Sequence, residues 1–196
     1  MNKSRLEAFS DGVIAIIITI MVLEIKVPHG EEWKDLLPLY PTVLSYIISF
    51  IYVGIYWCNH HHLLHTVKKV GPGIMWSNMH LLFWLSLIPF ATAWMGDNHF
   101  APHTLILYAL LLMMCGVAFT ILQQVIIKCH PSYDPAMVNV LKQQRKKALI
   151  SVGLYILAIP MAFYSAVLSG SLFVLVAIIW LVPDRNIARV LEKESD

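Results

Sequence analysis

The sequence predicts an all-α integral membrane protein with six transmembrane helices, and this prediction depends on composition, hydropathy and the placement of charge. Of the 196 residues, 58% are hydrophobic and 13% are charged. Soluble domains average roughly 45–50% apolar and about 25% charged residues. The mean hydropathy is +0.68. A chain this poor in polar residues cannot coat a soluble surface, so we expect much of its apolar surface to face lipid.

Six apolar segments are candidates to cross a bilayer, which requires about 20 mostly apolar residues per helix. Breaks rich in Pro, Gly or Ser separate them, including Gly71-Pro72-Gly73 and Ser169-Gly170-Ser171. The sixth segment is the weakest because its purely apolar part, 172–181, is short for a full crossing. All six are predicted to form one domain over residues 1–196, with spans at 5–27, 36–64, 74–95, 102–127, 147–168 and 171–187.

Basic residues alternate between the two sides of these spans. Lys3 and Arg5 precede the first span, Lys68 and Lys69 follow the second, and the segment 142–147 between the fourth and fifth spans is strongly basic. The intervening loops carry acidic residues or few charges. Since cytoplasmic loops of membrane proteins are enriched in Lys and Arg, both termini are predicted to be cytoplasmic in a multi-pass protein of the cell membrane.

The first span has two different sides when its residues are placed at about 100° per residue. Asp11 lies on one side, and an ionisable group at that depth requires a partner or water. We expect that partner on another span, with Trp57, His60 and Asn78 as candidates. Ser4 and Glu7 match a capping box, which predicts the start of this helix. The other side is a mostly apolar stripe of Arg5, Phe9, Gly12, Ile16, Thr19, Ile20, Leu23 and Val27.

The first half of the chain resembles a known family. Arg5-Leu6-Glu7-Ala8-Phe9-Ser10-Asp11 is similar to the Arg-x-x-x-Phe-Ser-Asp signature of the endolysosomal potassium channel family and its bacterial homologues. Tyr56-Trp57-Cys58-Asn59-His60 resembles the Trp-x-x-His pattern in that family's second helix. Residues 76–78 and 89–92 resemble its third helix. The second half resembles the family in layout rather than in motifs.

The resemblance implies a potassium-selective cation channel of the bacterial inner membrane, with K⁺ as the permeant ion. Conduction is expected to be passive, through a homotetramer whose four first helices line a central pore. The family's apolar constriction falls on the position of Ile16, and a ring of isoleucines can gate an ion path by dewetting. The hydroxyl of Thr19 is expected to assist selectivity. The sequence indicates no cofactor, no enzyme activity and no nucleic-acid partner.

The candidate site residues form two groups with different expected roles. The pore-lining and gate residues are Ile16, Thr19, Ile20 and Leu23. The second group combines the signature motif with a network that docks the first helix onto its neighbours. Its members are Arg5, Phe9, Ser10, Asp11, Trp57, His60 and Asn78.

A secondary transporter coupled to protons or ions is the main alternative function. Asp11, His60 and His80 are conceivable relay groups, and Pro89 and Pro160 could break helices as transporters often require. The chain shows no internal repeat, which argues against this alternative. Electrical recording separates the two classes, because a channel passes large passive currents.

Neither a metal site nor an enzyme site is predicted. His61 and His65 have the i, i+4 spacing that can chelate a metal ion, but no carboxylate or cysteine lies beside them. We therefore expect hydrogen-bonded histidines near the membrane surface. No Ser-His-Asp set, pair of membrane aspartates or nucleotide-binding loop is recognisable.

Overall fold

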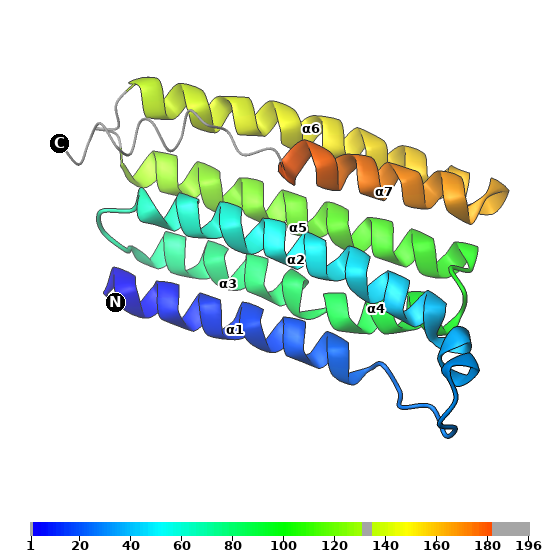
Figure 1. Cartoon of the computed structure of the whole chain (residues 1–196). Coiled ribbons are helices and arrows are strands. Elements are labelled where there is room, and N and C mark those ends of the chain that lie inside the picture. The colour runs from blue at the N-terminus through cyan, green and yellow to red at the C-terminus, as the bar shows by residue number, and fades with distance from the viewer. Residues whose placement is uncertain (1, 131–134, 182–196) are drawn as a thin grey trace.

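The structure, a computed structural model, describes residues 2–130 and 135–181, apart from the side chains of 135–143. Its elements are helices that run side by side, parallel or antiparallel, in one bundle (Figure 1). The all-α fold class is therefore confirmed. In chain order they are α1 (Lys3–Leu23), the 3-10 helix η1 (Trp33–Leu39), α2 (Tyr40–His65), α3 (Pro72–Ser86), α4 (Ile88–Asp97), α5 (Pro102–Cys129), α6 (Pro135–Tyr164) and α7 (Ala166–Leu181).

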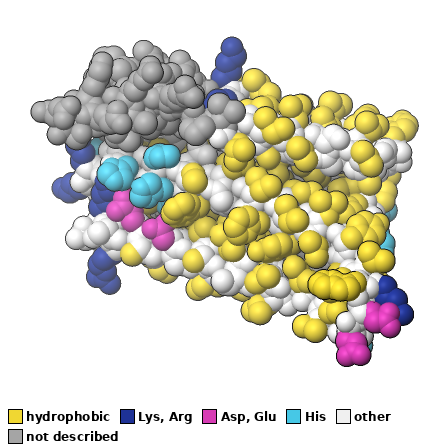
Figure 2. All heavy atoms as spheres, in the orientation of Figure 1, with side chains coloured by type: hydrophobic (Ala, Val, Ile, Leu, Met, Phe, Trp, Pro, Cys, Tyr) yellow, Lys and Arg dark blue, Asp and Glu magenta, His cyan; other side chains and the backbone are white. Residues whose placement is uncertain are grey.

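Length and hydropathy make the chain an integral membrane protein. Five stretches are long and apolar enough to cross a membrane, namely Lys3–Leu23, Trp33–His65, Pro72–Asp97, Pro102–Cys129 and Gln144–Tyr164. Figure 2 shows hydrophobic side chains over the middle of the bundle, with His and most charged side chains towards its two ends and further Lys or Arg side chains on the upper edge beside the grey region. The apolar helix α7 is shorter, with 16 residues. A sixth span over 171–187 stays a prediction, since residues 182–187 lie outside the described part.

A break at Leu87 divides the predicted third span into α3 and α4. Pro89 causes it, because a proline provides no N–H and its ring clashes with the carbonyl four residues earlier. Pro160 lies inside α6, which nevertheless continues to Tyr164. Pro72 and Pro102 stand at the first positions of α3 and α5, where a missing N–H costs nothing.

The start of α1 differs from the predicted capping box. The helix begins at Lys3, after Asn2, and no side chain caps it. The Lys3 ammonium instead donates to the carbonyl of His65 at the end of α2, over 2.8 Å, and lies 3.8 Å from the Glu7 carboxylate. The prediction was wrong because a contact between helices, invisible in the local sequence, engages the residues around the predicted cap.

The break predicted at Ser169-Gly170-Ser171 was also wrong, because α7 runs continuously through these residues. The chain turns at Ser165 instead. The hydroxyl of Ser169 donates to the carbonyl of Ala158 on α6 over 3.0 Å. The hydroxyl of Ser171 donates to the carbonyl of Val167 over 2.8 Å. These carbonyl acceptors allow serines to remain inside a helix, where they would otherwise favour turns.

The helices are layered from α1 at one edge of the bundle to α6 and α7 at the opposite edge, with α2 and α5 between them (Figure 1). Buried hydroxyls join the layers: Thr92 of α4 donates to Ser49 of α2 over 2.6 Å, and Ser49 bonds to Tyr108 of α5 over 2.8 Å. Each hydrogen bond between membrane helices contributes on average about 0.6 kcal/mol to the stability of the fold. These bonds therefore help to fix the position of α2 between α4 and α5.

Successive connections alternate between the two ends of the bundle (Figure 1). The N-terminus, the α2–α3 connection, the last turn of α5 and the first turn of α6 share one end, which we call the basic end. It carries Lys3, Arg5, Lys68, Lys69, Lys128, Arg145, Lys146 and Lys147. The opposite end carries most of the acidic residues of the first half, including Glu31, Glu32, Asp35 and Asp97.

Candidate pore helix and its docking network

Helix α1 has one face buried in its own chain and one face left exposed. The buried residues include Leu6, Ser10, Ile14, Ile17 and Met21, each at most 3% exposed, where α1 packs on α2, α3 and α4. All four predicted pore residues lie on the other face. Exposed fractions there reach 58% for Ile16, 42% for Ile20 and 79% for Leu23, and Thr19 is also exposed.

We call this face the exposed stripe; it comprises the predicted row Arg5, Phe9, Gly12, Ile16, Thr19, Ile20 and Leu23. Val27 was predicted to extend this row but lies beyond the end of α1 at Leu23. Thr19 places a hydroxyl among its apolar side chains. That hydroxyl donates to the carbonyl of Ile16 over 2.9 Å, a bond within the same helix. Its proton is thus directed at the backbone, and its oxygen lone pairs remain available. Oxygen ligands of this kind can replace part of a cation's hydration shell.

The centre of the docking network is a buried chain of three polar side chains from three helices. The Asn78 amide of α3 donates to the hydroxyl of Ser10 on α1 over 3.0 Å. The oxygen of the same amide lies 2.7 Å from Nε2 of His60 on α2. An amide oxygen can only accept, so Nε2 of His60 carries the proton in this arrangement. All three side chains are at most 1% exposed.

Asp11 belongs to a separate contact nearer the surface of the bundle. The indole N–H of Trp57 donates to its carboxylate over 2.9 Å. Within the described residues Asp11 makes no hydrogen bond to His60 or Asn78, two of its three candidate partners. The neighbouring Ser10 reaches Asn78 instead, because consecutive helix residues point about 100° apart.

Arg5 and Phe9 are not brought into this network. Phe9 is 51% exposed on the stripe. Arg5 is also exposed and has no ion pair or hydrogen bond to a residue in the described ranges. These two motif side chains therefore remain open to contacts outside the single chain. Sequence reasoning missed a further contact of α1, in which the Thr92 hydroxyl lies 3.9 Å from the sulfur of Met21.

The proposed relay groups of a transporter are not gathered in one place. His60 bonds to Asn78, whereas His80 accepts the indole N–H of Trp84 over 2.9 Å within α3. In the part of the chain that the structure describes, His, Cys, Asp and Glu side chains form no group of three that could hold a metal ion. The exposed rings of His61 and His65 lie 5.6 Å apart, centre to centre.

Comparison with known proteins identifies the family. The family model described as "Endosomal/lysosomal potassium channel TMEM175" matches residues 5–89, which cover most of α1 and all of α2 and α3. A potassium channel of Chryseobacterium sp. is 51% identical over 193 residues, covering 98% of this chain and 100% of that channel. This chain belongs to the TMEM175 family. The family match contains the whole docking network and the exposed stripe.

Two other TMEM175 proteins extend the comparison. A crystal structure of a homolog from Chamaesiphon minutus, described as a lysosomal potassium-selective channel, superposes with a TM-score of 0.76 at 29% identity. The match covers 94% of this chain and 97% of that one, so the fold is shared over nearly the whole length. A chicken TMEM175, named an endosomal/lysosomal proton channel, is 38% identical over 81 residues, 35% of this chain and 16% of its own.

Proposed function

We propose that this protein is a potassium-selective cation channel that conducts passively through a homotetrameric pore lined by α1. The supporting observation is the two-faced burial of α1, which docks one side onto its own chain and leaves a mostly apolar stripe exposed. Four-fold cyclic symmetry would place four such stripes around one axis. The TMEM175 relatives named as potassium channels support the choice of ion.

The proposed orientation has the basic end in the cytoplasm of a bacterial cell, with the protein in the inner membrane. Lys and Arg are enriched in cytoplasmic loops because they resist transfer across the membrane. In this orientation the chain forms one six-span domain, with residues 171–187 as the last span. A cation leaving the cytoplasm would then meet Ile16 first and Leu23 last.

Ile16 is the proposed gate. A narrow ring of isoleucine side chains expels water, and a cation entering it would lose hydration without gaining polar ligands. A small widening of the ring would let water return. Thr19 lies three residues further, about 4.5 Å along the axis at a rise of about 1.5 Å per residue. Four hydroxyl oxygens there would receive the ion on one side of the constriction and favour K⁺.

The Ile16→Asn variant tests this assignment. An amide ring holds water, so we expect K⁺ flux into proteoliposomes to rise by roughly tenfold, with a weaker preference for K⁺ over Na⁺. Val22→Asn is the matched control: Val22 is 44% exposed on α1 but lies about 120° away from Ile16 around the helix. Unchanged flux and selectivity in Ile16→Asn would remove Ile16 from the gate.

The oligomeric state requires its own measurement. Light scattering of the purified protein, corrected for bound detergent, should give the mass of four chains of 22.3 kDa. A monomer would contradict a pore lined by α1, because the exposed stripe of one chain does not enclose a path.

Proton conduction is a second candidate function, favoured by the names of the vertebrate relatives. The same proteoliposomes, loaded with a pH-sensitive dye and placed in a proton gradient without K⁺, would reveal it. A secondary transporter would instead show saturating, coupled uptake and no large passive current under voltage clamp.

A further inference from the structure

A groove between α5 and α6 opens near the basic end of the bundle, with a volume of about 260 Å³ for water-sized molecules. Its two ends differ in chemistry. Arg145 and Gln124 line the end nearest the basic surface. The rest of its lining is mostly apolar and includes Gly116, Val117, Ile121, Leu149 and Val152.

The polar end of the groove carries a positive charge that no side chain in the described part of the chain neutralises. Arg145 and Gln124 are exposed, and neither side chain has a hydrogen bond or ion pair to a residue in the described ranges. The sequences of α5, α6 and α7 contain no Asp or Glu. Lys128, also exposed, follows Gln124 by one turn on the same face of α5. A guanidinium in such a place can bind a phosphate through two parallel hydrogen bonds.

A buried pair of side chains next to Gln124 and Arg145 joins α5 to α6. The amide of Gln123 donates to the amide oxygen of Gln144 over 2.7 Å, and both residues are at most 5% exposed. Their sequence neighbours Gln124 and Arg145 therefore stand side by side at the mouth of the groove. The polar end is thus positioned by the fold, although its side chains are exposed.

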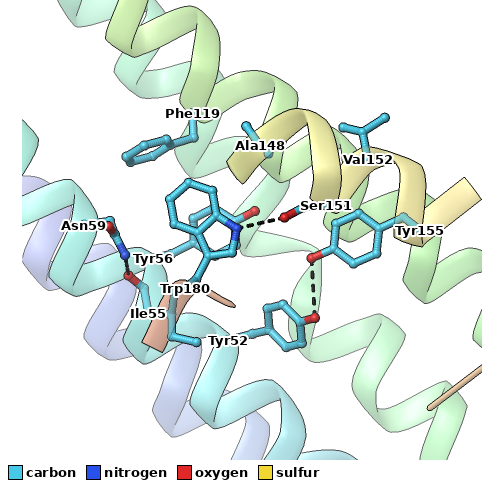
Figure 3. A pocket seen from close by; sticks show the side chains of 11 residues that line it. Tyr52, Ile55, Tyr56, Asn59, Phe119, Ala148, Ser151, Val152, Tyr155 and Trp180 are labelled. Atoms are coloured by element: carbon cyan, nitrogen blue, oxygen red, sulfur yellow. Dashed lines mark hydrogen bonds between the residues drawn. The ribbon is translucent and has the colours of Figure 1, made fainter. Parts of the chain in front are cut away.

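The apolar part of the groove has the length of an acyl-chain segment. From Gln124 to Gly116, α5 rises about 12 Å, close to half of a hydrocarbon layer of about 30 Å. Gly116, Ala148 and Val152 also border a cavity of about 40 Å³ for water-sized molecules, whose lining includes aromatic rings such as Trp180 (Figure 3). Small side chains at Gly116 and Ala148 leave the groove deep.

We propose that this groove binds one anionic phospholipid, with its phosphate on Arg145 and Gln124 and one acyl chain along α5 and α6. We choose this ligand because its phosphate complements the positive charge of Arg145 and its acyl chain matches the length of the groove. The choice of lipid over a second copy of the chain rests on the proposed function: α6 lies at the opposite edge of the bundle from α1 (Figure 1). If α1 faces the pore axis, this edge faces the bilayer.

Native mass spectrometry of the purified oligomer tests the proposal, with phosphatidylglycerol and phosphatidylcholine of equal chain length as probes. The wild-type protein should retain phosphatidylglycerol in preference to phosphatidylcholine. Arg145→Gln should weaken phosphatidylglycerol binding by about tenfold, the usual scale for one charge-assisted contact. Lys146→Gln is the matched control, because Lys146 is the exposed neighbour on α6 but does not line the groove.

A second variant tests the acyl-chain part. A Cβ at Gly116 would meet its nearest heavy atom, the Tyr56 hydroxyl oxygen, at an ordinary 3.8 Å. Gly116→Ala should therefore fold, narrow the groove and weaken binding of long-chain phosphatidylglycerol, while a dihexanoyl analogue is unaffected. Equal retention of the two headgroups, or equal effects of Arg145→Gln and Lys146→Gln, would overturn the proposal.

A cysteine variant tests whether a second chain occupies the groove instead. Disulfide formation between copies carrying Leu149→Cys would mean that a second chain covers the groove, which would overturn the lipid assignment.

The mass-spectrometry experiment also separates the lipid site from the channel function, because lipid retention is measured without ion flux. A protein that conducts K⁺ but binds no phosphatidylglycerol refutes the lipid site alone, and the reverse result refutes the conduction proposal alone.

Discussion

Removing the Asn78 side chain should weaken the docking of α1 more than any other single change in the network. Asn78 bonds to Ser10 on α1 and to His60 on α2, and it is fully buried. Two hydrogen bonds between membrane helices contribute together about 1 kcal/mol. Asn78→Ala also leaves the buried Nε2–H of His60 without its acceptor, which costs about 1–3 kcal/mol. We therefore expect Asn78→Ala to lower the free energy of unfolding by about 2–4 kcal/mol.

Reversible unfolding in mixed micelles, at a fixed protein concentration, would measure this loss. Asn59→Ala is the matched control, because the Asn59 amide donates only within its own helix, to the carbonyl of Ile55 over 2.8 Å. It should lose less than about 1 kcal/mol. A double-mutant cycle of Ser10→Ala with Asn78→Ala should give a coupling energy near 0.6 kcal/mol, the average for such bonds. Additive effects, or an Asn78→Ala variant as stable as the control, would refute the network's role.

Two further predictions concern helix contacts. Asp11→Ala removes the acceptor of the Trp57 N–H, so size-exclusion chromatography of this variant should show loss of the assembled particle. Asp11→Asn keeps an oxygen acceptor and should assemble. An Asp11→Ala variant that assembles and has altered ion selectivity would contradict the docking role of Asp11. Gly96→Val should lower the free energy of unfolding by about 1–3 kcal/mol, because a Cβ at Gly96 would lie 2.7 Å from Cα of Thr42. Gly54→Ala, with open space around its Cβ, should be neutral in the same assay.

The fold class could be predicted from the sequence because it depends on quantities that are sums along the chain. Hydropathy over about 20 residues and the alternation of basic loops are such sums, and they locate long helices without knowledge of their neighbours. The two sides of α1 also followed from periodicity, since every predicted stripe residue from Ile16 to Leu23 is exposed. Helix boundaries were less accurate because single contacts decide them. Lys3 and Ser169 are examples, because the side chain of each donates a hydrogen bond to a helix other than its own.

The candidate site was likewise predicted only in part from the sequence. The sequence named Ser10, Asn78 and His60 as network members. Of the three candidate partners that it named for Asp11, Trp57 is the observed one, and His60 and Asn78 are not. Which of two adjacent side chains reaches Asn78 depends on the rotation of α1 against α3, because adjacent side chains of a helix point about 100° apart. The groove beside Arg145 was not predicted at all, because it is a space between two helices and has no local pattern.

The amino-acid sequence was enough to predict that this protein is integral to a membrane, which end of the bundle is basic, and which face of α1 is mostly apolar. These properties belong to the order of residues along each helix. Tertiary structure alone decided which polar side chains are partners, that Pro89 divides a span while Pro160 does not, and where grooves lie. Those outcomes depend on distances of a few ångströms between helices, and only packing sets such distances.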